Sequence, residues 1–308
     1  MKARYLKWYK KPFKMLSVLI TIYHYNLYPL VQQLHQQCEA ANIDFEILTQ
    51  DDASESVHNL ENEVINQLKY AQFFVLPKNV GYRENKNLLA QKAKYPWLLI
   101  LDGDCVIPNE NFIQNYLNSI QEDLDGVYGG RKHPEVCPSD QQKLRWKYGK
   151  FMEDNPLDNR MKKPYESFLF NNTLIRKSIF EQVKFDASFQ KYGHDDTLFS
   201  FELKRIGARL HHIDNPVVHD NIDINEVYCQ KTKGATDNLL YLYKNKKIPA
   251  NYTKLLLLIH FLHATKMYYL VRFAYKFFEK PLQKNLTGSQ PSLLAFNCFR
   301  LGYACQKI

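Results

Sequence analysis

A buried strand that ends in two carboxylates constrains this chain more than any other feature. The apolar run Trp97–Leu101 is typical of a parallel-sheet strand covered on both faces, and Asp102 and Asp104 follow it with one glycine between them. Alternate residues of an extended segment point to the same side, so both acids can face one ligand. Two carboxylates held close repel each other, and a divalent cation that also binds phosphate oxygens relieves this repulsion.

The position of this motif also suits a binding site. Open α/β sheets bind their ligands at the carboxyl ends of strands, and Gly103 allows the backbone to approach a neighbour closely. An aspartate-glycine pair is equally common in solvated turns. The motif alone therefore leaves a ligand site and an ordinary turn as open alternatives.

The segments before this strand alternate between strand and helix patterns. We expect strands at residues 15–23, 43–49 and 72–76, each followed by a helix, at about residues 26–41, 57–68 and 85–94. Together with the Trp97 strand, this order predicts a parallel, doubly wound half.

The second half of the chain is less regular. Residues 134–164 are polar and bounded by prolines, which predicts a loop over the site with one helix near 141–151. The remaining expected elements are helices at 111–121, 177–183 and 195–206, strands at 126–130, 167–175 and 208–213, and an extended piece at 216–219. The fold class that follows is α/β with a mostly parallel sheet and a helical C-terminal appendage.

The charge is distributed unevenly over the 308 residues. Residues 1–14 hold six Lys/Arg and no acid, residues 223–308 hold thirteen against four, and residues 15–222 carry a net charge of −6. We therefore divide the chain into a basic aromatic leader (1–14), an acidic globular domain that holds the paired acids (15–222) and a basic helical region (223–308). Basic ends on an acidic body indicate contact with an anionic surface, either lipid or nucleic acid.

The apolar segment 255–278 is studded with basic residues. On one continuous helix, Lys254, Arg272 and Lys276 fall within about 40° of one another at 100° per residue. This pattern predicts a helix in the membrane interface, with the leader as a second contact. The alternative is a helical appendage that packs on the body and exposes a solvated basic face.

The six cysteines show no CxxC spacing and predict reduced thiols in a cytoplasmic protein. No uncharged apolar stretch reaches the roughly 18 residues of a spanning helix. Residues 2–23 resemble a signal peptide but lack a small-residue cleavage site. We expect a peripheral protein on the inner face of the cell membrane.

Five stretches in order resemble the family 2 glycosyltransferases, nucleotide-sugar-dependent enzymes of the GT-A fold. The resemblance covers about residues 16–219. Its motifs are TIYHYN after the first strand, DDAS after the second, NVGYRENKNLLAQKA, LDGD, and YGHDDTLF followed by VVH. Each motif alone is weak, and their common order carries the resemblance.

The resemblance implies a metal site and a catalytic base. Asp104, Asp102 and His219 match residues that hold a divalent metal, Mn²⁺ or Mg²⁺, which acts as a Lewis acid on the leaving diphosphate; Asp102 could instead contact the donor ribose. Asp196 matches the general base, with Asp195 beside it where relatives usually carry glutamate. A helix start favours a charged carboxylate, although both acids could simply cap that helix.

On the donor side, Thr21, Tyr23 and Asp52 match residues that line the nucleobase pocket. A carboxylate that accepts an imide N–H favours uridine, although guanine and thymine offer the same group. Lys86 stands where an arginine is usual, and its point charge cannot reproduce a bidentate contact. Three further stretches lie where relatives shape the sugar and acceptor pockets, or form a turn, a helix surface and a strand end: residues 129–131, 145–148 and 171–172.

The implied function is an inverting, metal-dependent transfer of a sugar from a UDP-sugar to a hydroxyl of a lipid-linked or cell-surface polysaccharide acceptor. No nucleic acid partner is expected. A nucleotidyltransferase would also use paired acids, but it should have a glycine-rich, basic loop after the first strand. A non-catalytic protein that binds nucleotide, lipid or nucleic acid is the other alternative, and it does not account for acidic motifs at several strand ends.

Overall fold

A seven-stranded, mostly parallel sheet organises the computed structural model, which describes residues 15–188 and 192–308. The strand order is β3-β2-β1-β4-β8-β6-β9, and only β8 runs antiparallel to its neighbours β4 and β6. The strands are β1 (Met15–Ile22), β2 (Asp44–Asp51), β3 (Ala71–Val75), β4 (Trp97–Asp102), β6 (Gly126–Tyr128), β8 (Asn172–Arg176) and β9 (Leu210–His212). The doubly wound fold class expected from the sequence is confirmed.

Helices cover both faces of this sheet. Along β1, Val18 and Ile20 join a core with α1 (Tyr28–Ala40) and α4 (Phe112–Ser119), while Leu19 points to the opposite core. That opposite core includes side chains of α3 (Tyr82–Lys92), α7 (Lys177–Val183) and α8 (Asp195–Arg205). The alternation explains why the parallel strands read as continuous apolar runs. A short α2 (Asn59–Asn62) continues into the 3-10 turn η1 (Glu63–Gln67).

A second, three-stranded sheet lies beside the end of β4. It consists of β5 (Cys105–Val106), β10 (Val217–His219) and β7 (Arg131–Lys132), with β10 in the middle. His219 pairs with Cys105, and Val217 pairs with Arg131. Backbone pairing therefore joins three distant segments next to the acidic strand end.

The segment expected to form a loop over the site is largely helical. It contains η2 (Asp140–Gln142), α5 (Lys143–Tyr148), the π-helical turn η3 (Gly149–Glu153) and α6 (Leu157–Lys162). Its arginines Arg145 and Arg160 are buried: Arg145 pairs with Glu153, and Arg160 donates hydrogen bonds to the carbonyl oxygens of Tyr128 and Ile213. The strand expected at 167–175 is restricted to β8, and residues 167–171 only lead into it.

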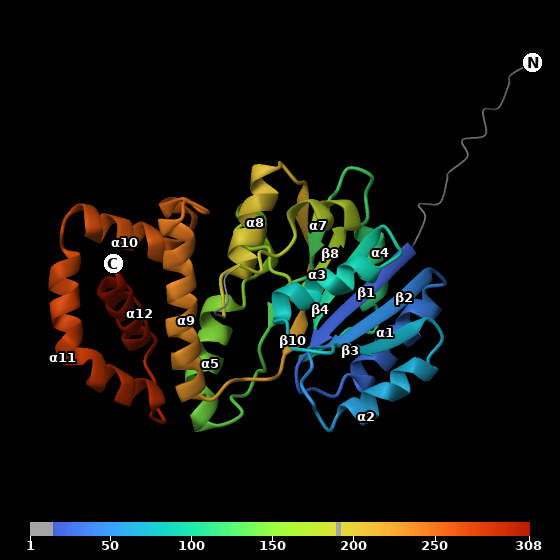
Figure 1. Cartoon of the computed structure of the whole chain (residues 1–308), viewed down its shortest axis with the longest axis horizontal. Helices are drawn as coiled ribbons and strands as arrows, with labels where there is room; N and C mark the ends of the chain where they lie inside the picture. Colours follow the sequence, from blue (N-terminus) through green and yellow to red (C-terminus); the bar gives the residue numbers. More distant parts are fainter. Residues whose placement is uncertain (1–14, 189–191) are drawn as a thin grey trace, which may run out of the picture.

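Four long helices form the C-terminal end of the molecule (Figure 1). They are α9 (Asn225–Lys244), α10 (Lys254–Ala264), α11 (Tyr268–Thr287) and α12 (Leu293–Lys307), with the turn η4 (Ala250–Tyr252) before α10. They share cores with the rest of the chain: Leu144 of α5 packs with Phe296 and Phe299, and Leu198 of α8 packs in a cluster with Leu256.

The expected continuous helix over 255–278 is wrong. The chain breaks between α10 and α11, where Lys266 has a positive φ of 60°, so Lys254 does not share a helix with Arg272 and Lys276. In the two described stretches, every helix is too short or too polar to cross a membrane. The basic leader lies outside the described residues.

Candidate active site

A cavity of about 660 Å³ opens at the carboxyl ends of β1, β2 and β4. The backbone register explains its position, because Thr21 lies opposite Asp102 and Ile22 lies opposite Asp51 in the parallel ladder. All nine residues that the sequence singled out line this one cavity: Thr21, Tyr23, Asp52, Lys86, Asp102, Asp104, Asp195, Asp196 and His219.

Lys86 enters the cavity from α3 and binds the first acid of the strand end. Its Nζ lies 2.8 Å from Asp102 Oδ1 and 3.4 Å from the carbonyl oxygen of Phe170. The Lys86 side chain is only 8% exposed, whereas Asp102 is 39% exposed and faces the cavity. A buried cation of this kind needs a paired charge, so Lys86 fixes the Asp102 carboxylate in place.

The second acid pairs with the late histidine. Asp104 Oδ2 lies 3.5 Å from His219 Nδ1, since β5 and β10 pair next to both residues. Burial alone would raise the pKa of Asp104, but the hydrogen bond and charge of His219 hold that pKa below its usual range. Gly103 is required here, because a Cβ at that position would lie 2.2 Å from Ile22 Cγ2.

These donors fit a cation only together with a ligand. Within the described part of the chain, no three His, Cys, Asp or Glu side chains lie close enough to bind a metal. Asp104 and His219 are in contact, while Asp102 is turned to Lys86. One or two protein donors plus substrate phosphates are the usual setting of Mg²⁺ in nucleotide sites, and the site has that composition.

Asp195 and Asp196 are the first two residues of helix α8 at the cavity wall, and the N-cap residue before them is His194. Tyr82 Oη donates a hydrogen bond to Asp195 Oδ1, and Arg83 Nη2 lies 3.5 Å from the same oxygen. Burial and the neighbouring charge of Asp195 raise the pKa of Asp196 to about 7. Burial and the charge of Asp195 thus outweigh the helix start, which by itself favours the charged carboxylate.

The donor-side residues lie at the ends of β1 and β2. Asp52 is 4% exposed and accepts a hydrogen bond from the backbone N–H of Val80 at 2.8 Å. Burial raises the pKa of Asp52, although its hydrogen bonds from backbone N–H groups act to lower that pKa. Tyr23 is 57% exposed. Asp51 instead binds the Ser54 backbone and hydroxyl, which is a structural role.

The sequence did not identify Tyr82, Arg83 or Glu153 as parts of the site. Helix α3 begins at Tyr82, three residues before the expected start, because Gly81 precedes it with a positive φ of 83°. Tyr82 and Glu153 line the cavity, and so do Arg131 and Arg145 from the stretches that were left open. The signal available in the sequence was the glycine that ends the loop before α3.

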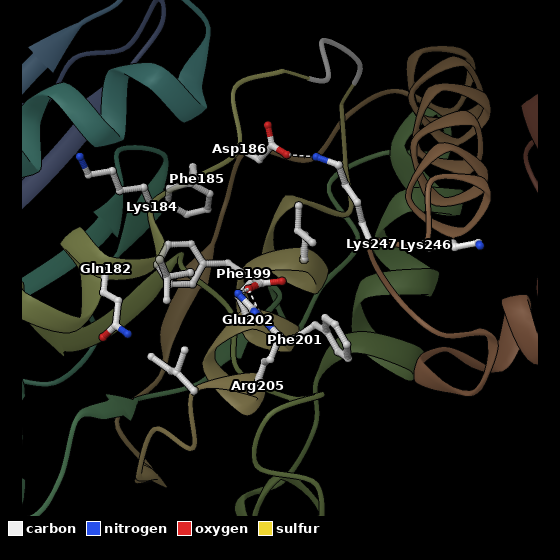
Figure 2. Close-up of a pocket in the computed structure, with 13 residues that line it drawn as sticks. Gln182, Lys184, Phe185, Asp186, Phe199, Phe201, Glu202, Arg205, Lys246 and Lys247 are labelled. Carbon is white, nitrogen blue, oxygen red and sulfur yellow. Dashed lines mark hydrogen bonds and ion pairs between the residues drawn. The ribbon is translucent and has the colours of Figure 1, made fainter.

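A second cavity, of about 720 Å³, lies between the ends of α7 and α8 and the turn after α9 (Figure 2). Figure 2 shows Lys247 directed at Asp186 and Arg205 beside Glu202, and both pairs are ion pairs. Phe185 and Phe199 on its wall are buried core residues. None of the residues expected in the site lines this cavity. Its larger volume therefore does not make it the candidate active site.

Residues 17–184, more than half of the chain, match the family described as Glycosyl transferase family 2. The chain belongs to this family. The matched residues include Asp52, Asp102 and Asp104 at the strand ends, and the match ends before Asp195, Asp196 and His219. No protein with a curated description matches the chain in sequence.

Solved structures agree with this glycosyltransferase fold. The mannosyltransferase PcManGT from Pyrobaculum calidifontis, in complex with GDP-Man and Mn²⁺, is 14% identical with a TM-score of 0.55, and the match covers 97% of this chain and 85% of that one. TarS 1-349 of S. aureus, in complex with UDP, is 16% identical with a TM-score of 0.51, over 76% and 68% of the two chains. At these identities the likeness shows the fold alone.

Proposed function

We propose that this glycosyltransferase transfers a sugar from a UDP-sugar to an acceptor hydroxyl with inversion at the anomeric carbon. One observation carries the proposal: nine residues chosen from five separate motifs line a single cavity at the carboxyl edge of the sheet. A nucleotidyltransferase or a non-catalytic binding protein has no comparable support, because neither explains the acids of α8 beside those of β4.

In the proposed reaction, Asp196 accepts the proton of the acceptor hydroxyl while that oxygen bonds to the anomeric carbon. The bond from the anomeric carbon to the phosphate oxygen breaks on the opposite face, and UDP leaves. Asp104 and His219 would hold a divalent cation, Mn²⁺ or Mg²⁺, which supplies charge stabilisation to the leaving diphosphate. Asp195 would orient acceptor groups from its fixed position against Tyr82.

Uridine is the proposed base. The buried Asp52 carboxylate lines the cavity beside Thr21, where it can accept an imide N–H. The exposed ring of Tyr23 offers a stacking surface at the same end. Lys86 would act through Asp102, which it holds toward the donor ribose or the cation, because the amine is already bound to that carboxylate.

The test measures nucleotide release from a panel of UDP-sugars and GDP-mannose with Mn²⁺ and mixed glycan acceptors. We expect release of UDP from one donor. Asp196→Asn should keep UDP affinity and slow transfer by at least about 10². Turnover with GDP-mannose alone would contradict the choice of base, and loss of UDP binding in Asp196→Asn would contradict the role of the base.

We also propose that the acceptor is a lipid-linked or surface glycan met at an anionic membrane. We place this contact at the inner face of the membrane, since all six cysteines are free thiols. The support is the outer face of α10 and α11. Residues 251–308 carry eight Lys/Arg and a single acid, Glu279, and Lys233 already pairs with that acid. Seven large apolar side chains of these helices are more than half exposed: Leu257, Phe261, Tyr269, Leu270, Phe273, Phe277 and Phe278.

Tyr269, Phe273 and Phe277 recur every four residues, so they form one stripe along α11. An apolar, aromatic stripe among basic residues fits the lipid interface better than nucleic acid, which would need a polar binding face. This support replaces the single-helix pattern expected from the sequence, which the break at Lys266 removes.

Vesicle flotation tests the membrane proposal with the full chain. We expect binding to an equimolar mixture of phosphatidylglycerol and phosphatidylcholine, and weaker binding to phosphatidylcholine alone. Phe273→Ser with Phe277→Ser should reduce flotation, whereas Val57→Ser, which is 80% exposed near α2, should not. Equal flotation of both variants, or none with the anionic vesicles, would contradict the proposal.

A further inference from the structure

Two arginines share one glutamate on the cavity wall formed by β7 and α5. Arg131 Nη2 and Arg145 Nη1 each lie 2.9 Å from the same oxygen, Glu153 Oε2, and all three side chains line the cavity of the proposed active site. We call Arg131 and Arg145 the arginine pair. Because two guanidinium groups face one carboxylate, the cluster keeps one uncompensated positive charge.

The surrounding groups do not neutralise this charge. Burial opposes the ionisation of Glu153, but the arginine pair lowers its pKa to about 2. Glu153 is therefore ionised and supplies one negative charge to the cluster. Burial lowers the pKa of His133, whose Nε2 lies 3.5 Å from Glu153. Lys231 on the same cavity is paired with Asp223 at 2.7 Å. The excess charge therefore resides on the arginine pair.

The arginine pair also has a donor to spare. Arg131 Nε is buried and donates no hydrogen bond to any atom of the described residues. The Arg145 side chain is only 8% exposed. Buried donors without acceptors are unfavourable and rare in native proteins. Guanidinium groups bind phosphate and carboxylate oxygens through paired N–H groups, so an oxyanion would satisfy the Arg131 donor.

The scaffold holds the arginine pair rigidly. The π-helical turn η3 begins at Gly149, where a Cβ would lie 2.3 Å from the His133 ring. That ring is held in turn by Asp154 Oδ1 at 2.6 Å from Nδ1. These contacts fix the turn that carries Glu153 against both arginines. π-Helical turns inside helices occur frequently at functional sites.

The arginine pair lies on a different part of the fold from the donor end. The nucleobase end is built by β1 and β2, whereas Arg131 comes from β7 and Arg145 from α5. Arg131, Arg145 and Asp196 nevertheless line the same cavity. An anion bound here would therefore share that cavity with the hydroxyl that Asp196 is proposed to deprotonate.

We propose that the arginine pair is an acceptor subsite that binds a phosphate or carboxylate group of an anionic glycan. The inference rests on the proposed transferase function and names the class of its acceptor. It predicts an acceptor with a charged group close to the reacting hydroxyl, such as a sugar phosphate or a uronic acid unit.

The experiment measures binding of three probes to the full chain by calorimetry: D-glucose, D-glucose 6-phosphate and D-glucuronate, each with and without saturating UDP and Mn²⁺. We expect at least one anionic probe to bind about tenfold or more tightly than glucose, since charge-assisted hydrogen bonds are the difference. The stronger of the two identifies phosphate or carboxylate as the natural group. Equal affinity for all three probes would overturn the inference.

Variants locate the response. Arg131→Gln should abolish the anionic preference, and Arg131→Lys, which keeps the charge but not the fork, should reduce it. Lys143→Gln on α5, which lies outside the cavity lining, serves as the control and should keep it. A preference that survives Arg131→Gln would place the anion elsewhere.

UDP separates this inference from the proposed function. If UDP binds and the Arg131→Gln variant retains its affinity for UDP, the arginine pair serves the acceptor. If UDP abolishes the anionic response and Arg131→Gln loses UDP, the arginine pair holds the donor diphosphate and the inference is wrong. Failure of UDP to bind the native chain would contradict the proposed function instead. The response to the three probes would then still decide whether the arginine pair binds an anion.

Discussion

Asp196 shows how an environment gives a carboxylate a different task from its neighbour. Asp195 is held by Tyr82 and Arg83, so its charge is compensated by hydrogen bonds. For Asp196, burial together with the charge of Asp195 outweighs the lowering effects of Lys86 and the Phe170 backbone, and its pKa is raised. A buried carboxylate whose pKa is raised beside a second acid is typical of acid-base sites.

This difference predicts an unusual pH profile. Only the ionised Asp196 can accept a proton, so kcat/KM should be full above its raised pKa and should fall as the pH drops through that value. Asp195→Asn removes the neighbouring charge and should move this acid limb to lower pH. An acid limb at the same pH in Asp195→Asn and in the native chain would contradict the assignment of this limb to Asp196. Asp44→Asn, at the exposed start of β2, is the control.

Lys86 illustrates what a residue type alone does not reveal. The sequence placed it where an arginine is usual and left its donor contact in doubt. In the structure its amine is buried against Asp102, so a point charge is sufficient there. A single acceptor at 2.8 Å needs no bidentate fork.

At the scale of elements, the junction between β4 and β5 determines whether the two acids share one cavity. A Cβ at Gly103 would lie 2.2 Å from Ile22 Cγ2 and 3.0 Å from Leu27 Cδ2. Gly103→Ala must therefore push the ends of β1 and β4 apart. We expect a loss of about 1–3 kcal/mol in the free energy of unfolding and weaker UDP binding in the presence of Mn²⁺.

Gly288→Ala is the matched control, because the Cβ there would be 3.2 Å from a carbonyl oxygen and Gly288 does not line the cavity. Chemical denaturation and calorimetry measure both variants. If Gly103→Ala were as stable as Gly288→Ala and bound UDP normally, the close contact at this junction would have no role.

The parallel strands β1, β2, β3 and β4 could be predicted along the chain because burial on both faces leaves an apolar run followed by polar residues. The acids at the ends of β2 and β4 were visible for the same reason. The arginine pair was not assigned, since its partner Glu153 lies on a π-helical turn whose polar sequence reads as a loop. Backbone pairing of β10 with β5 and β7 also depends on tertiary contacts that no local pattern contains.

At the scale of the whole molecule, the C-terminal helices are not a detachable appendage. Phe296 and Phe299 of α12 are buried against Leu144 of α5, and Leu256 of α10 packs in the cluster that contains Leu198 of α8. A chain that lacked residues 251–308 would expose these partners to water. Each large apolar side chain involved contributes roughly 1.5–3 kcal/mol when buried.

Removal of residues 251–308 should therefore lower the Tm of the remaining chain, as measured by calorimetry. The point variants of α11 proposed above remove membrane contacts without this effect, since Phe273 and Phe277 are exposed. An unchanged Tm after truncation would show that the C-terminal helices and the catalytic part are independent units.

Binding of UDP with and without Mn²⁺, measured by calorimetry on the full chain, tests most directly whether these distant acids form one nucleotide-diphosphate site. We predict that Mn²⁺ tightens UDP binding at least about tenfold, and that Asp104→Asn loses this gain while Asp44→Asn keeps it. Equal UDP affinity with and without Mn²⁺, unaffected by Asp104→Asn, would contradict the account.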